Sequence, residues 1–158
     1  GVASVVWRPG IHMVAAHGGA GASAMAAVTG CIDAGRAWPC SADRANAVVV
    51  CARTNARGLE AARDAAMRFY AGHIRGVEVV GLVLIADAPG RRLPKALAEA
   101  SSVVAGAYPR CWRVPWVEGL RLDGRWPSKL PASVARVVDE IVGLDGVRER
   151  ERNLTHVE

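Results

Sequence analysis

The stretch Ile11–Ser23, which reads IHMVAAHGGAGAS, decides the fold that the sequence predicts. Residues 11–16 are mostly apolar and have the length of a buried strand, and small residues compatible with a helix run from Ser23 to about Cys31. A glycine-rich turn separates the two segments. A strand, a glycine-rich turn and a helix in this order are typical of a parallel α/β unit.

The remainder of the chain repeats this alternation of strand-like and helix-like segments. Short apolar runs predict further strands at residues 47–52, 77–86 and 111–117. Apolar stripes at helical spacing predict helices at residues 58–72, 93–104 and 131–144. We interpret residues 33–46 as a loop, because glycine, proline and polar residues interrupt them. The sequence thus predicts an α/β fold of three layers, with a mainly parallel sheet and helices on both of its faces.

Length and composition fit one domain, residues 1–147, followed by a charged tail, residues 148–158. The chain has 158 residues, of which 51% are apolar and 22% charged, a balance typical of globular proteins. No apolar run reaches the roughly 18 residues that a membrane span needs, and the first ten residues do not resemble a signal peptide. Four unevenly spaced cysteines fit free thiols in a reducing compartment better than a zinc site. We therefore expect a cytoplasmic protein with no membrane span and no metal site.

The net charge of +5 comes almost entirely from arginine, since only two of the 20 basic residues are lysines. Codon usage in a high-GC genome explains an arginine excess without any function, and the arginines are scattered, with clusters only at residues 91–92 and 148–152. The alternative is a polyanionic partner such as nucleic acid, because guanidinium groups bind phosphates through two hydrogen bonds. Trp112, Trp116 and Trp126 lie among arginines, and core packing explains them better than a protein interface or stacking on bases.

The turn after the first strand is the feature that carries chemistry, and it consists of His17, Gly18, Gly19, Ala20, Gly21, Ala22 and Ser23. Glycines allow successive backbone N–H groups to point toward one centre, and the N-terminus of the following helix adds a partial positive charge. Phosphate groups bind at such helix N-termini. We therefore predict an anion-binding cradle at these residues, with His17 as a candidate contact to a phosphate. The alternative is a turn that only lets strand and helix pack closely.

The standard phosphate-binding loop of nucleotide hydrolases has the pattern GxxxxGK[ST], of which the chain keeps only Gly21 and Ser23. The deviant pattern of the MinD/ParA family, roughly KGGxGK[ST], fits better. Gly18, Gly19, Gly21 and Ser23 resemble it position by position, whereas His17 and Ala22 stand where that family has lysines. The resemblance implies a shortened P-loop NTPase-like fold from which both cationic side chains have been lost.

Further segments resemble the same family between about residues 11 and 119. Residues 47–55, AVVVCARTN, are similar to a strand and loop of MinD-like proteins, and residues 81–87, GLVLIAD, are similar to their next strand. The motifs HGGAGAS and ADAPG are also similar to those of short uncharacterised proteins of high-GC Gram-positive bacteria.

The resemblance leaves two roles open for Asp87. In the first role, Asp87 replaces an asparagine that recognises the base, and the switch II segment has been deleted. In the second role, Asp87 and the following Ala-Pro-Gly form switch II, and the carboxylate holds Mg²⁺ through water. Residues 31–47 look too short for another strand and a switch, which slightly favours the first role. In both cases Asp87 follows a strand, where open α/β sheets bind ligands.

The resemblance implies a pseudo-NTPase, a binding or scaffold protein that keeps the cradle without the catalytic lysine. We predict no catalytic residue, and ATP or another phosphate-bearing ligand is the candidate cofactor. A homodimer or a protein partner is expected. One alternative is a nucleotide-binding switch in which arginine replaces lysine, with four candidates, Arg53, Arg57, Arg91 and Arg92. The other is an Arg-rich DNA-binding accessory protein of a mobile element.

Overall fold

A sheet of five parallel strands forms the centre of the computed structural model, which describes residues 1–90, 92–123 and 125–156. The strands are β2 (Ile11–Ala15), β3 (Ile32–Gly35), β5 (Asn46–Arg53), β6 (Val77–Ile85) and β7 (Cys111–Val114). Their order across the sheet is β3, β2, β5, β6, β7, and every neighbouring pair is parallel. Two short strands, β1 (Val2–Ser4) and β4 (Trp38–Cys40), form a separate parallel pair.

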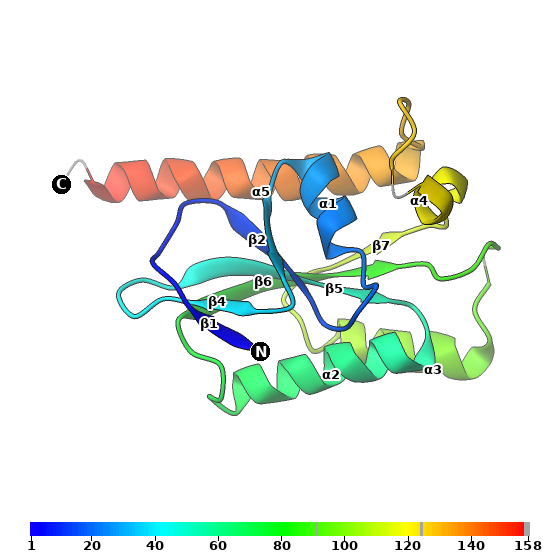
Figure 1. The fold of residues 1–158 in the computed structure, drawn as a ribbon, viewed down its shortest axis with the longest axis horizontal. Helices are drawn as coiled ribbons and strands as arrows, with labels where there is room; N and C mark the ends of the chain where they lie inside the picture. Colours follow the sequence, from blue (N-terminus) through cyan, green and yellow to red (C-terminus); the bar gives the residue numbers. More distant parts are fainter. Residues whose placement is uncertain (91, 124, 157–158) are drawn as a thin grey trace.

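Helices cover both faces of the sheet, so the three-layer α/β architecture is confirmed (Figure 1). One face carries α1 (Ala22–Thr29) and α5 (Ala132–His156), and the other carries α2 (Ala56–Tyr70) and α3 (Lys95–Ala105). The short helix α4 (Glu118–Asp123) follows β7. Among residues 1–90, 92–123 and 125–156, no helix combines the length and the apolar character needed to cross a bilayer.

The strand β5 shows why its sequence is apolar at almost every position. Val49 and Cys51 belong to the core cluster under α1 and α5, whereas Val48 and Val50 belong to the cluster under α2. All four side chains are fully buried. Because helices cover both faces of a parallel sheet, a central strand has no side that faces water, and its sequence reads as a continuous apolar run.

Residues 33–46, interpreted above as a loop, contain most of β3 and the whole of β4, so that interpretation is wrong. Both strands are short, and β3 is an edge strand with half-exposed side chains and the exposed Asp33. An edge strand of four residues buries too little to need an apolar run, and therefore lacks the signal that reveals β5. Residues 31–47 thus hold two short strands, whereas the sequence analysis considered them too short for another strand and a switch together.

The helix α5 runs from Ala132 to His156, well past the end predicted at residue 144. Residues 148–156 of the predicted charged tail are therefore helical, while residues 157–158 lie outside the described part of the chain. The guanidinium of Arg148 donates two hydrogen bonds to the carboxylate of Glu78, at 2.6 and 3.2 Å. The Arg152 guanidinium lies 5.5 Å from the centre of the Trp7 ring. These contacts between distant segments hold the last turns of the helix in place.

Two of the tryptophans serve packing, as predicted. Trp112 is 7% exposed and lies so close to Gly81 that a Cβ added there would come within 2.5 Å of the ring. The indole N–H of Trp126 donates to the carbonyl of Ala24 at 2.7 Å, which places this ring over α1.

The buried His12 on β2 predicts a pH dependence of stability. Burial lowers the pKa of this imidazole below its usual 6.5, and the positive charge of Arg8 lowers it further, while a contact to the Ala47 carbonyl partly opposes both. The unfolded chain therefore takes up a proton at a pH where the folded chain does not, and the free energy of unfolding falls as the pH drops below about 6.5. Urea unfolding of wild type and His12→Asn between pH 7.5 and 5 measures this. The variant should show the shallower decline, and equal slopes would contradict the assignment.

Candidate functional site

The strand order positions a candidate site at the carboxyl ends of β2 and β5. The chain leaves β2 through α1 to reach β3 on one side, and then crosses by way of β4 to β5 on the other side. Such a reversal of direction opens a crevice outside the carboxyl ends of the strands, where doubly wound α/β proteins bind ligands. The glycine-rich loop leaves β2 at this point.

The loop has the backbone conformation that its glycines allow. Gly19 and Gly21 have positive φ angles of 76° and 94°, in the left-handed region that other residues rarely adopt. Gly21 caps α1, no side chain makes a capping hydrogen bond, and the first turn of this helix contains no acidic residue. Within the described part of the chain, no side chain caps the first turn of α1, which keeps the partial positive charge of a helix N-terminus.

The side chains of the loop point mostly into the protein. Ala20 and Ala22 are 1% and 4% exposed and belong to the core cluster under α1 and α5. Gly21 lies so close to Ile85 that an added Cβ would overlap the end of that side chain. Gly18, Gly19 and Ser23 are exposed. The exposed surface of this turn therefore consists largely of backbone.

His17 uses both ring nitrogens inside the protein. Its Nε2 accepts a hydrogen bond from the backbone N–H of Arg53 at 3.0 Å, and its Nδ1 lies 2.9 Å from the carbonyl of Gly18. The two partners together select the tautomer with the hydrogen on Nδ1, which then donates to Gly18. His17 is 6% exposed and links the loop to the end of β5. Its contact to a phosphate stays a prediction.

Arg53, at the end of β5, brings a positive charge to the loop. Its Nε donates to the carbonyl of Gly19 at 2.9 Å, and one terminal nitrogen donates to the carbonyl of Ala86 at 3.3 Å. Of the four arginines named as candidates, Arg53 thus contacts the loop through its side chain, and Arg91 lies outside the described residues. The sequence contained Arg53 but gave no spacing argument for its position.

Ser23 and Asp33 form a contact that the sequence analysis missed. The Ser23 hydroxyl, in the first turn of α1, donates to a carboxylate oxygen of Asp33 at 2.7 Å. The other carboxylate oxygen of Asp33 accepts a hydrogen bond from the backbone N–H of Gly35 at 2.9 Å. The sequence signal for this edge strand is weak, because it consists of the apolar Ile32 followed by the acidic Asp33.

Asp87 lies just beyond the carboxyl end of β6, with β5 between that strand and β2. Its carboxylate accepts a hydrogen bond from the side-chain amide of Asn55 at 3.0 Å. The oxygen of the Asn55 amide caps α2 by accepting from the N–H of Gly58 at 2.7 Å. Since Arg53 joins Gly19 to Ala86, the residue before Asp87, the same edge of the sheet carries both the loop and Asp87. Its roles at a base or with Mg²⁺ stay predictions.

These features define a parallel α/β protein with a glycine-rich loop at the switch point of its sheet. The chain belongs to the family described as family of unknown function DUF6668, which matches residues 9–138. The match includes all five strands of the central sheet and the whole loop. No curated protein and no solved structure matches the chain.

Proposed function

We propose that the chain is a pseudo-NTPase, a binding or scaffold protein that holds a phosphate-bearing ligand such as ATP on residues 17–23 without hydrolysing it at a useful rate. The supporting observation is the N-terminus of α1, which lacks a side-chain cap behind two glycines with positive φ. Backbone N–H groups in this arrangement are suited to a phosphate, whatever the side chains are.

The lack of turnover follows from the side chains. Ala22 and His17 occupy the positions at which the resembled family has lysines, and Ala22 is buried. Phosphoryl transfer is catalysed mainly by positioning and by stabilisation of charge. Loss of one such donor typically costs about 3 kcal/mol of transition-state stabilisation, or roughly 100-fold in rate. With both cationic groups absent, we expect the protein to bind the ligand without hydrolysing it at a useful rate.

A nucleotide-binding switch is the second candidate function, and the position of Arg53 favours it. The guanidinium lies against the loop and brings a positive charge to the surface on which a phosphate would bind. This candidate differs from a scaffold in its response to the γ-phosphate: a switch must bind the triphosphate and the diphosphate with different affinity, since equal affinity shifts no equilibrium.

Thermal unfolding with phosphate, ADP, ATP and GTP at 10 mM, with and without Mg²⁺, tests ligand binding. A ligand with a Kd near 1 mM stabilises the fold by about 1.4 kcal/mol at this concentration, which raises Tm by roughly 3–6 °C. Phosphate release measured in parallel should stay more than about 100-fold below one turnover per second. An unchanged Tm with every ligand would remove the proposal, and turnover near one per second would replace it with an active hydrolase.

Arg53→Gln should weaken ATP binding about tenfold, because a charge-assisted hydrogen bond contributes roughly 1.5–3 kcal/mol. Arg57→Gln is the matched control, since Arg57 is an exposed arginine in the first turn of α2. This control should change the Kd by less than about twofold. Equal Kd values for Arg53→Gln and wild type, measured by titration calorimetry, would exclude Arg53 as the cation of the site.

Self-association or a protein partner is part of the proposal, because a scaffold acts through what it binds. Sedimentation analysis with and without ATP measures self-association.

The DNA-binding alternative predicts binding to duplex DNA that weakens steeply with salt, and a lack of binding at low salt removes that alternative.

A further inference from the structure

A pocket of about 530 Å³ lies at the end of the sheet opposite the glycine-rich loop. It is bounded by residues at or just before the starts of β2, β3, β5 and β6 and by the second half of α5. Its volume falls within the range of about 300–1,000 Å³ that small-molecule sites occupy. Because the loop lies at the carboxyl ends of the same strands, the pocket is separate from the site discussed above.

Four arginines from three distant segments line this pocket. Arg8 precedes β2, Arg44 precedes β5, and Arg148 and Arg152 lie one turn apart on α5. The fold alone brings these residues together, since the sequence separates the first from the last by most of the chain. Convergence of guanidinium groups on one concave surface is typical of sites for carboxylates and phosphates.

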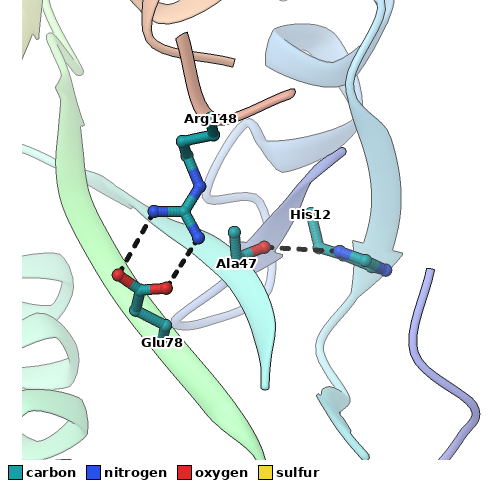
Figure 2. A network of polar contacts seen from close by, with 4 residues as sticks. All are labelled: His12, Ala47, Glu78 and Arg148. Atoms are coloured by element: carbon teal, nitrogen blue, oxygen red, sulfur yellow. Dashed lines mark hydrogen bonds and ion pairs between the residues drawn. The ribbon is translucent and has the colours of Figure 1, made fainter. Parts of the chain in front are cut away.

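Arg148 forms a fixed wall of the pocket. Figure 2 shows its guanidinium on the carboxylate of Glu78, with His12 and Ala47 on the neighbouring strands β2 and β5. The pairing holds the pKa of Glu78 below its usual value and raises the pKa of Arg148, so both groups stay charged and compensate each other. This pair therefore anchors α5 to β6, and the remaining three arginines are the candidates for a ligand.

Arg44 and Arg152 lie on the same indole ring. Their guanidinium carbons are 4.3 and 5.5 Å from the ring centre of Trp7. A terminal guanidinium nitrogen of Arg152 also lies 3.5 Å from a carboxylate oxygen of Glu149, and the side chain of Glu149 is 64% exposed. Two like charges near one ring repel each other, and an anion bound close to both guanidinium groups would offset this repulsion.

The pocket also sets limits on its ligand. Trp7 and Ile32, which are both partly exposed, give it an apolar part, which suits an organic group and not a bare ion. Three carboxylates, Glu78, Asp145 and Glu149, share the lining with the four arginines. The many phosphates of a nucleic acid would be repelled by these carboxylates, whereas a molecule with a single anionic group can bind away from them.

We propose that this pocket binds a small organic oxyanion, a phosphate monoester or a carboxylate, through Arg8, Arg44 and Arg152, with its apolar part against Trp7 and Ile32. The proposal does not depend on the function proposed for the loop. Phenyl phosphate, benzoate and inorganic phosphate are suitable probes, because they vary the oxyanion and the apolar part separately.

Titration calorimetry, with NMR of the Trp7 indole N–H, tests the proposal. Phenyl phosphate should bind wild type at least about fivefold more tightly than inorganic phosphate does and should shift the Trp7 signal. The double variant Arg44→Gln/Arg152→Gln should lose at least about tenfold in affinity. Arg63→Gln/Arg68→Gln removes the same charge from exposed positions on α2, across the sheet, and should bind like wild type. Arg53→Gln, at the loop, should leave the response of the Trp7 signal to phenyl phosphate unchanged, because Trp7 lines the pocket and not the loop.

Several outcomes would overturn the proposal. These are a lack of binding to wild type at 10 mM phenyl phosphate, an equal loss in the two double variants, or a Trp7 shift that disappears in Arg53→Gln and so depends on the loop. Salt-dependent binding of duplex DNA that needs Arg44 and Arg152 would instead assign the surface to nucleic acid. If the double variant is unfolded by circular dichroism, Arg8→Gln replaces it, because the side chain of Arg8 is exposed, and it should weaken binding severalfold.

Discussion

Gly58→Ala should lower the free energy of unfolding by about 2–3 kcal/mol, although alanine favours a helix over glycine by roughly 1 kcal/mol. Gly58 lies in the first turn of α2, at the point where this helix meets the end of β5. A Cβ added there would overlap the carbonyl oxygen of Arg53 and lie 2.9 Å from its carbonyl carbon. These are backbone atoms of a central strand, so they cannot rotate away as a flexible side chain would, and the whole turn would have to move.

Gly143→Ala is the matched control, because Gly143 is also a helical glycine, on the exposed side of α5 with nothing within 4 Å of an added Cβ. Helix propensity acts alone at this position, and the variant should gain about 0.5–1 kcal/mol. Urea unfolding of both variants therefore gives changes of opposite sign. A stabilised Gly58→Ala would show that the contact between α2 and β5 is looser than the structure has it.

The clash at Gly58 has a functional consequence for the candidate site. Arg53 holds Gly19 through its side chain and His17 through its backbone N–H. A turn displaced at Gly58 therefore moves the residue that joins β5 to the loop. If the loop binds phosphates as proposed, Gly58→Ala should weaken that binding even at temperatures where the variant is folded.

The sequence predicted those parts of the fold in which local pattern and burial agree. The continuous apolar run of β5 predicts a strand buried on both faces, and the structure shows this burial at residues 48–52. The strand β3 escaped prediction because it is an edge strand with Asp33 exposed, so its residues carry no apolar pattern. The end of α5 was placed too early because the contacts that hold its last turns, Arg148 to Glu78 and Arg152 to Trp7, join segments that only the fold brings together.

The candidate site, too, could be predicted from the sequence only in part. The glycines of the loop were found from sequence, since positive φ angles and a strand-to-helix turn have a local signature. The partners of the loop were not, because they depend on strand order. Arg53 reaches Gly19 only because β5 lies next to β2, and Ser23 reaches Asp33 only because β3 lies on the other side. The pocket at the amino ends of the strands depends on the reach of α5 and has no local signature.

His17→Ala should lower the free energy of unfolding by about 2–4 kcal/mol and Tm by roughly 5–10 °C. The change removes a buried ring that joins Gly18 to Arg53, and it leaves the backbone N–H of Arg53 without its acceptor. A partly buried donor without a partner costs about 1–3 kcal/mol, and the space left by the ring adds to this cost. His73→Ala is the control, because His73 is exposed beyond the end of α2 and its backbone N–H keeps its bond to Arg68. It should stay within about 0.5 kcal/mol of wild type.

The same variant separates two roles of this histidine. If His17 positions the loop, His17→Ala loses stability without any ligand present, and anion binding weakens as a consequence of the displaced turn. If His17 instead contacts a phosphate directly, Tm without ligand should barely change, while the stabilisation by 10 mM ATP disappears. The hydrogen bonds to Arg53 and Gly18 favour positioning, because an imidazole with both nitrogens occupied inside the protein has no further polar atom to offer a ligand. An unchanged Tm together with lost ATP binding would therefore overturn this assignment and restore the direct contact predicted from sequence.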